Sequence, residues 1–310
     1  MSQHLNTNGK ANQLRPGDLV EVRSLAEILT TLDEKGRLDN LPFMPEMIAS
    51  CGKQFRVWRL AFKTCVDDGD MREMPDTVLL EEVRCDGASH NGCDRGCLIF
   101  WKTAWLKKPG AAATAAKIAT ITEHDLTVLA QRDGEFFCQS TEIVNASQPL
   151  PWWEPRQYLW DLKYNRVSAF LFTRAFLIAV YNKFAFHLKL RSWRAVTGNT
   201  TSTNGFGRLN LRPGEVVRVK TLAEIKTTLD AEGKNQKMLF APSMAAFCGQ
   251  VMKVRDRVEN IVLEATPRQR KIKDTVVLEG ATCDGVCHRL CPRQSLLFWR
   301  ECWLERVEEA

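Results

Sequence analysis

Alternating hydrophobic and polar residues over 19–23 predict a half-buried β-strand near the start of the chain. A helix start follows, because Ser24 is a favourable N-cap and Glu27 stands three residues later, the spacing of a capping box. The segments 55–59 and 77–81 are rich in β-branched and aromatic residues and are predicted to be further strands. The first third of the chain therefore indicates a small, mainly β domain with short helices.

The same pattern returns near the C-terminus, where Leu-Arg-Pro-Gly-Glu from Leu211 repeats Leu-Arg-Pro-Gly-Asp from Leu14. The capping pair also returns, as Thr221 and Glu224. We interpret the chain as a tandem duplication, since internal similarity of this length indicates repeated domains. The predicted divisions are a flexible leader 1–13, a first repeat 14–108, an insert 109–197, a linker 198–210 and a second repeat 211–306.

The predicted fold class is α+β, with two homologous small SH3-like β-barrel domains that carry short helices. A hairpin and a long helix in the insert are predicted to join them. The hairpin is expected from strands over 126–130 and 136–143 around Asp133 and Gly134. The segment 158–190 is strongly apolar and lacks Pro and Gly, which predicts one long helix, with a single break as the alternative.

The predicted helix is basic as well as apolar. Between 155 and 194 the only acid is Asp161, against eight basic residues: Arg156, Lys163, Arg166, Arg174, Lys183, Lys189, Arg191 and Arg194. A cation near the centre disfavours a transmembrane span. Peripheral contact of 155–194 with an acidic membrane is one interpretation. The other is burial between the two barrels, because apolar residues occur all round the helix.

Composition and charge bear on the cellular location, the thiol chemistry and the partners of the protein. The N-terminus has no apolar signal region, so we expect a cytoplasmic protein with reduced thiols. Eleven cysteines there indicate metal binding or redox chemistry more than disulfides. Nucleic acid is disfavoured as a partner, because the formal net charge of +6 is only modestly positive and no recognisable nucleic-acid-binding motif is present. Oligomeric state is not predicted.

A dense group of thiols and imidazoles occurs once in each repeat, and we call the segments 85–97 and 283–295 the cysteine loops. In repeat 1 the candidate metal ligands are Cys65, Cys85, His90, Cys93 and Cys97. In repeat 2 they are Cys283, Cys287, His288 and Cys291. Either set could hold zinc, which is bound by four thiolate or imidazole ligands, or an iron–sulfur cluster, with zinc slightly preferred. The isolated Cys51, Cys138, Cys248 and Cys302 are expected to be small core residues.

An aromatic segment follows each loop, with Trp101 and Trp105 in repeat 1 and Trp299 and Trp303 in repeat 2. These side chains are expected in the domain cores, where large aromatics dominate packing.

The repeated wording Pro-Gly-Asp/Glu, Phe-x-Pro-x-Met, Cys-Gly, Cys-Asp-Gly and Phe-Trp-x4-Leu resembles a family of bacterial proteins associated with biosynthetic gene clusters. Pro45-Glu46-Met47 with Cys51-Gly52 also resembles the barrel half of the nitrile hydratase β subunit, a likeness that concerns the fold alone. Two functions follow as hypotheses. One is a metal-binding accessory or scaffold protein that recruits a partner protein or pathway enzyme. The other is an iron–sulfur or metal-dependent redox enzyme that uses the second cysteine loop.

Overall fold

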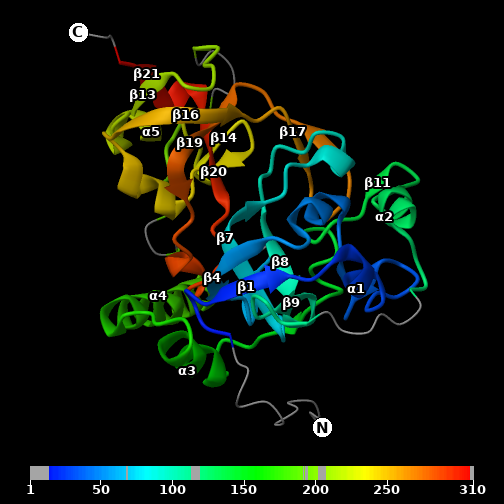
Figure 1. Ribbon diagram of the computed structural model, residues 1–310. Coiled ribbons are helices and arrows are strands. Elements are labelled where there is room, and N and C mark those ends of the chain that lie inside the picture. Colours follow the sequence, from blue (N-terminus) through cyan, green and yellow to red (C-terminus); the bar gives the residue numbers. More distant parts are fainter. Residues whose placement is uncertain are drawn as a thin grey trace.

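The computed structural model describes residues 14–67, 69–112, 119–190, 192, 195–201 and 207–307, so the predicted leader 1–13 lies outside the described residues. The described chain is a mixed α and β structure in which each repeat contributes a five-stranded antiparallel sheet (Figure 1). The mixed fold class and the barrel-like sheets agree with the prediction. Repeat 1 is drawn in blue and cyan and repeat 2 in yellow to red.

The repeat 1 sheet has the order β8-β7-β4-β1-β9. Its strands are β1 (Leu19–Val22), β4 (Gln54–Leu60), β7 (Thr77–Arg84), β8 (Leu98–Lys102) and β9 (Leu106–Lys107). The repeat 2 sheet has the corresponding order β20-β19-β16-β13-β21. Its strands are β13 (Val216–Val219), β16 (Val251–Arg257), β19 (Thr275–Thr282), β20 (Leu296–Arg300) and β21 (Leu304–Arg306).

Local irregularities are duplicated along with the strands. The β4–β7 register shifts between Val57 and Arg59, and the β16–β19 register shifts between Val254 and Asp256, the matching positions of repeat 2. A bulge bends a strand and strengthens its twist, which helps a short sheet to curve around a core. Both repeats therefore build the same curved sheet in the same way.

The predicted aromatic core is confirmed, because Trp101, Trp105, Trp299 and Trp303 are fully buried. In each repeat one phenylalanine meets both tryptophans edge to face: Phe43 lies 5.4 Å from Trp105, ring centroid to centroid. Such contacts add to the large apolar area that these rings bury.

Short helices close each sheet. The predicted capping boxes are present: Ser24 with Glu27 begins α1 (Leu25–Leu29), and Thr221 with Glu224 begins α5 (Leu222–Lys226). Further small elements of repeat 1 are β2 (Arg37–Leu38), β3 (Leu41–Pro42), η1 (Pro45–Ser50), η2 (Ala88–His90) and η3 (Thr103–Trp105). Those of repeat 2 are β14 (Lys234–Asn235), β15 (Met238–Leu239), η4 (Pro242–Phe247), η5 (Val286–His288) and η6 (Glu301–Trp303).

The insert hairpin is shorter than predicted. Asp133 and Gly134 form its turn, both with positive φ, between β10 (Gln131–Arg132) and β11 (Glu135–Phe136). The predicted first strand, 126–130, is wrong, since 126–129 belong to α2 (Glu123–Leu129) and Ala130 is the C-cap of this helix. Thr122 caps this helix in a capping box with Asp125, a local signal that outweighs the β-branched residues of the segment.

The predicted long helix is interrupted. It consists of α3 (Arg156–Lys163) and α4 (Ala169–His187), and Ser168 caps α4. Asn165 lies in the break, where its side chain accepts a hydrogen bond from the N–H of Leu60 (2.9 Å) and donates one to the carbonyl of Leu60 (3.2 Å). A tertiary contact with the end of β4 thus holds the break open. The interpretation of burial between the barrels is wrong for α4, which exposes much of its apolar surface.

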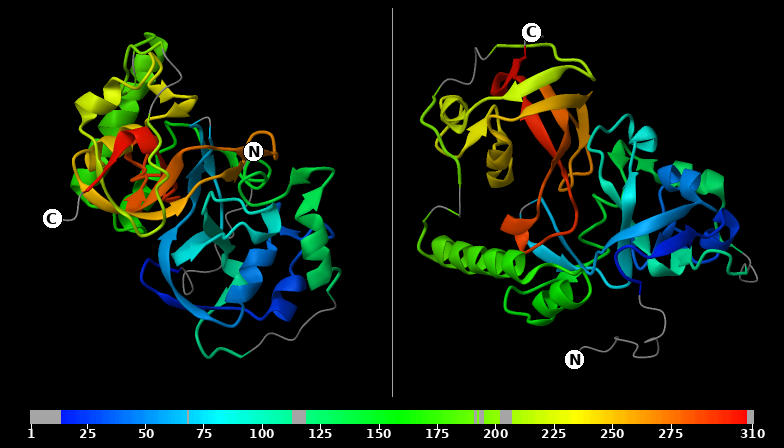
Figure 2. Two further views of the ribbon diagram at one scale, coloured as in Figure 1. Left: turned by 90° about the horizontal axis from the view of Figure 1, so that it is seen from above. Right: turned by 60° about the vertical axis from the view of Figure 1, so that its left-hand side comes forward.

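The two repeats exchange hairpins. From repeat 1, β5 (Lys63–Cys65) and β6 (Met71–Glu73), extended by β12 (Gln148–Pro149) of the insert, reach the cysteine loop of repeat 2. From repeat 2, β17 (Asn260–Val262) and β18 (Gln269–Lys271) reach the cysteine loop of repeat 1. Figure 1 shows β17 beside the cyan loop of repeat 1, and the right-hand view of Figure 2 shows the orange loop of repeat 2 lying against α4.

The exchanged contacts are reciprocal. The N–H of Cys65 donates to the sulfur of Cys291 (3.1 Å), and the N–H of Val262, which aligns with Cys65, donates to the sulfur of Cys93 (3.3 Å). Arg293 donates to the carbonyl of Cys65 (3.0 Å), as Arg95 does to that of Val262 (3.2 Å). The domains are therefore related by an approximate two-fold axis, and each completes the cysteine loop of the other.

Candidate metal centre

Each cysteine loop turns on a glycine. Gly87 and Gly285 have φ of 73° and 71°, and each precedes a 3-10 turn, η2 or η5, that carries the histidine. A Cβ at either position would lie 2.2 Å from a backbone oxygen of the same loop, that of Cys93 or Cys291. Only glycine fits this tight turn, which brings the glycine and the last cysteine of Cys-Asp-Gly-x5-Cys against each other.

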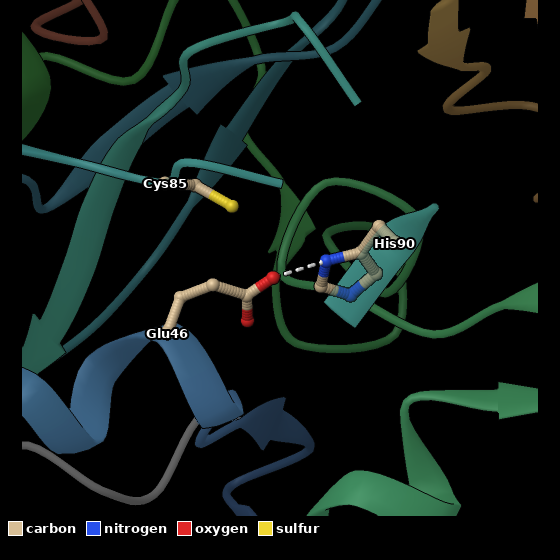
Figure 3. A group of neighbouring side chains, drawn as sticks. All are labelled: Glu46, Cys85 and His90. Carbon is tan, nitrogen blue, oxygen red and sulfur yellow. Dashed lines mark hydrogen bonds and ion pairs between the residues drawn. The ribbon is translucent and has the colours of Figure 1, made fainter. Parts of the chain in front are cut away.

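In repeat 1 the loop packs against η1 and forms a Glu–Cys–His group. Ligand atoms of Glu46, Cys85 and His90 all lie within 4.8 Å of one another. The side chains of Glu46 and His90 are each 2% exposed, and Nδ1 of His90 lies 2.7 Å from Oε1 of Glu46. Figure 3 shows the carboxylate of Glu46, on η1, beside the thiol and the imidazole that the cysteine loop supplies.

The carboxylate of Glu46 is only partly satisfied. Its Oε1 accepts the N–H of Ser89 (3.0 Å) in addition to its contact with His90. Its Oε2 is buried and has no hydrogen-bond partner. An unpartnered buried carboxylate oxygen is costly, so this atom is available to a ligand that could supply the missing contact.

Burial and neighbouring groups shift the pKa values of both acids of the group. Burial alone would raise the pKa of Glu46, but the hydrogen bond and charge of His90 lower it below its usual range. Burial and the nearby Glu46 charge raise the pKa of the Cys85 thiol. The group therefore combines a carboxylate with a protonated thiol. A bound metal ion would instead lower the pKa of the thiol, because its positive charge stabilises the thiolate.

Further thiols surround the triad. One cavity is lined by Cys85, His90, Cys93, Cys97 and Cys138, and Val262 and Arg293 of repeat 2 contribute to its wall. Burial raises the pKa of Cys138 to about 11. Cys138, expected to be a small core residue, packs partly against the core and also faces this cavity.

Cys65 lies elsewhere. Its sulfur is 3.2 Å from that of Cys291, so it joins the second cysteine loop and not the Cys85 group. Both thiols are free, and Met71 and Leu150 pack around them. Repeat 1 thus contributes the thiol of Cys65 to the cysteine loop of repeat 2.

Repeat 2 lacks the carboxylate. Ser243 takes the place of Glu46 at the start of η4, and burial with the charge of Arg289 lowers the pKa of His288. Across the described ranges, the ligand atoms of Cys283, Cys287, His288 and Cys291 do not form a group as close as the repeat 1 triad. The two loops have the same backbone conformation but differ in the side chains that could bind a metal.

Sequence reasoning missed Glu46 and Cys138. Glu46 carries a detectable signal, because it is a charged residue inside the apolar Pro-x-Met motif and is replaced by Ser243 in the other copy. Cys138 carries none, since it belongs to the insert and approaches the loop only through the tertiary fold.

A comparison of the chain with protein-family models, curated proteins and solved structures finds no match.

Proposed function

We propose that this chain is a metal-binding accessory or scaffold protein of a bacterial biosynthetic pathway, built on two SH3-like barrels, and that it holds one zinc ion in repeat 1. The pathway assignment rests on the sequence resemblance described above. The observation that carries the metal assignment is the buried Glu46–Cys85–His90 group with its unpartnered Oε2.

The donor set suits zinc. Sulfur, imidazole nitrogen and carboxylate oxygen are all common zinc ligands, and four-coordinate zinc accepts three protein donors and one further ligand. The ion would join η1 to the cysteine loop that the hairpin of repeat 2 covers. In this role the metal stabilises the domain interface and keeps the scaffold rigid.

The test is metal analysis of the purified full-length chain. We expect about one zinc ion per chain, lost or greatly reduced in Glu46→Gln, His90→Asn and Cys85→Ser. The matched controls are His288→Asn and Cys283→Ser, the corresponding changes in repeat 2, which are expected to leave the zinc content unchanged. Circular dichroism of each variant separates lost ligation from lost folding.

Two results would overturn the zinc assignment. One is a metal-free chain that has the same unfolding midpoint with and without added zinc. The other is full zinc content in the folded Glu46→Gln, His90→Asn double variant, which would place the ion elsewhere.

A redox role is the second candidate, and the four thiols of Cys85, Cys93, Cys97 and Cys138 around one cavity favour it. Four cysteines are the usual ligands of an iron–sulfur cluster. In that case anaerobically purified protein is brown, and Cys138→Ser loses the colour. The zinc proposal expects a colourless protein in which Cys138→Ser keeps its metal, so one variant separates the two candidates.

A further inference from the structure

Helix α4 presents an apolar face that no described part of the chain covers. Phe170, Leu177 and Phe184 recur at spacings of seven residues and are 79%, 61% and 62% exposed. Residues seven apart lie on nearly the same side of an α-helix. Tyr181 lies on the same side of the helix and is 43% exposed. A contiguous apolar face of this kind marks an interaction surface.

The N-terminal half of the helix is fixed to repeat 2 on another side, whereas Phe186, near the C-terminal end, is 75% exposed. Ala175 and Ile178 of α4, with Val167 just before the helix, pack with Val286 and Leu290 of the repeat 2 cysteine loop. The 19-residue helix is long and apolar enough to cross a membrane by length and composition. A helix with one side fixed to a folded domain cannot be surrounded by lipid, however. Its free face can lie only along a surface.

Charge identifies the kind of surface. At 3.6 residues per turn, Arg174 and Lys183 fall on opposite flanks of the exposed apolar face. The sequence from 162 to 194 contains no acidic residue and seven basic ones: Lys163, Arg166, Arg174, Lys183, Lys189, Arg191 and Arg194. An apolar face bordered by cations is typical of a helix that lies in the interface of an anionic bilayer.

The neighbouring helix extends the same chemistry. Tyr158 of α3 contacts the rings of Phe172 and Phe176, which joins α3 to α4. Leu159 is exposed on α3, and Trp153 is exposed just before it. Tryptophan is favoured at the headgroup level of membranes.

We propose that α4, together with α3, docks this chain onto an anionic lipid bilayer, with Phe170, Leu177 and Phe184 in the acyl boundary and the flanking cations at the headgroups. The proposal is independent of the metal site. Self-association through this face is disfavoured, because two copies would bring their cations together without a compensating acid.

The experiment is flotation of the full-length chain with phosphatidylcholine vesicles that either contain or lack phosphatidylserine. We expect binding to the anionic vesicles and release at high salt, since surface electrostatics are screened. Phe170→Ala with Phe184→Ala is expected to weaken binding at least about tenfold, because two exposed rings no longer enter the interface. Arg174→Gln with Lys183→Gln is expected to weaken it about fivefold per charge.

The matched control is Val251→Ser, which removes an exposed apolar side chain from the repeat 2 sheet and is expected to leave binding unchanged. Three outcomes would overturn the proposal. They are no flotation with either vesicle, equal binding by the Phe170→Ala, Phe184→Ala variant, and a wild-type dimer in solution that this variant converts to a monomer. The last would assign the face to a second copy of the chain.

Discussion

Replacing Asp161 by Asn is expected to destabilise the chain by about 3–5 kcal/mol, the usual cost of leaving one partner of a buried ion pair alone. Nζ of Lys63 lies 2.5 Å from Oδ2 of Asp161, and each side chain is 1% exposed. Lys63 belongs to β5 and Asp161 to α3, so this pair joins the insert to the hairpin that crosses between the repeats.

The size of the effect follows from desolvation. Burial lowers the pKa of Lys63 and raises that of Asp161, and in each case the partner's charge opposes the shift. Asparagine keeps the shape and removes the opposing charge, so Lys63 must either remain charged without a partner or lose its proton. The expected loss corresponds to about two to four powers of ten in the folding equilibrium.

The pair is not expected to be a large net source of stability. Oδ1 of Asp161 is buried without a hydrogen-bond partner, so the pair recovers only part of its desolvation cost. The double variant Lys63→Met, Asp161→Leu, which removes both charges and keeps the volume, is therefore expected to recover most of the loss. Apolar replacement of a complete buried pair is often neutral or stabilising.

Amide hydrogen exchange in α3, with urea unfolding of the whole chain, measures the effect. A chain of two domains can unfold in steps, so exchange gives the local free energy that a single unfolding midpoint would average. Glu154→Gln, which breaks an exposed pair with Arg156, serves as the control and is expected to cost below about 1 kcal/mol. The reasoning fails if Asp161→Asn costs no more than this control, or if the double variant is as unstable as the single one.

Three further predictions concern the domains and their loops. Glu301 accepts hydrogen bonds from the backbone amides of 209–211, and these bonds outweigh burial and lower the pKa of Glu301. Glu301→Gln is therefore expected to lower the free energy of unfolding by about 3 kcal/mol. The stability that the carboxylate provides above pH about 4.3 is expected to be lost as the pH falls through its lowered pKa, which acid titration of the unfolding midpoint measures. Gly87→Ala is expected to disrupt the repeat 1 cysteine loop and abolish zinc retention by metal analysis, because its Cβ would lie 2.2 Å from a backbone oxygen; retained zinc would contradict the described turn. Oxidised glutathione is expected to join Cys65 and Cys291 in a disulfide with release of two glutathione thiols, and peptide mapping that finds other pairs instead would contradict their 3.2 Å separation.

Local signals in the sequence were sufficient for much of each repeat. The capping boxes at Ser24 and Thr221 depend on side chains three residues apart, so the sequence alone predicts both helix starts. The burial of the tryptophans in the two cores was predictable, because large aromatic side chains gain most from burial and dominate the packing of small domains. Contacts between distant segments were not predictable. The break before α4 depends on Asn165 reaching the backbone of Leu60, and no pattern within the helix encodes it.

The candidate site was predicted only in part, because the sequence groups residues that are close along the chain and not those that meet through the fold. The histidine and first cysteine of the repeat 1 loop are close in sequence, and the fold brings them together. Glu46 enters from η1, and the zinc proposal depends on it. Cys65 was grouped with the wrong loop, because proximity in sequence favours its own repeat and the exchange of hairpins favours the other.

That exchange explains why the two copies could become different. In a symmetric dimer of one repeat, every substitution appears on both sides of the two-fold axis. Fusion into a single chain removes this constraint, so position 65 carries cysteine while its counterpart 262 carries valine, and Glu46 faces one cysteine loop while Ser243 stands in its place at the other. Both differences lie at the loops, whereas the sheet order, the bulges and the core tryptophans are the same in the two repeats. The two repeats have therefore kept one architecture while their cysteine loops differ, with a carboxylate–thiol–imidazole group at one and a thiol pair at the other. Each group can then serve a separate chemical role.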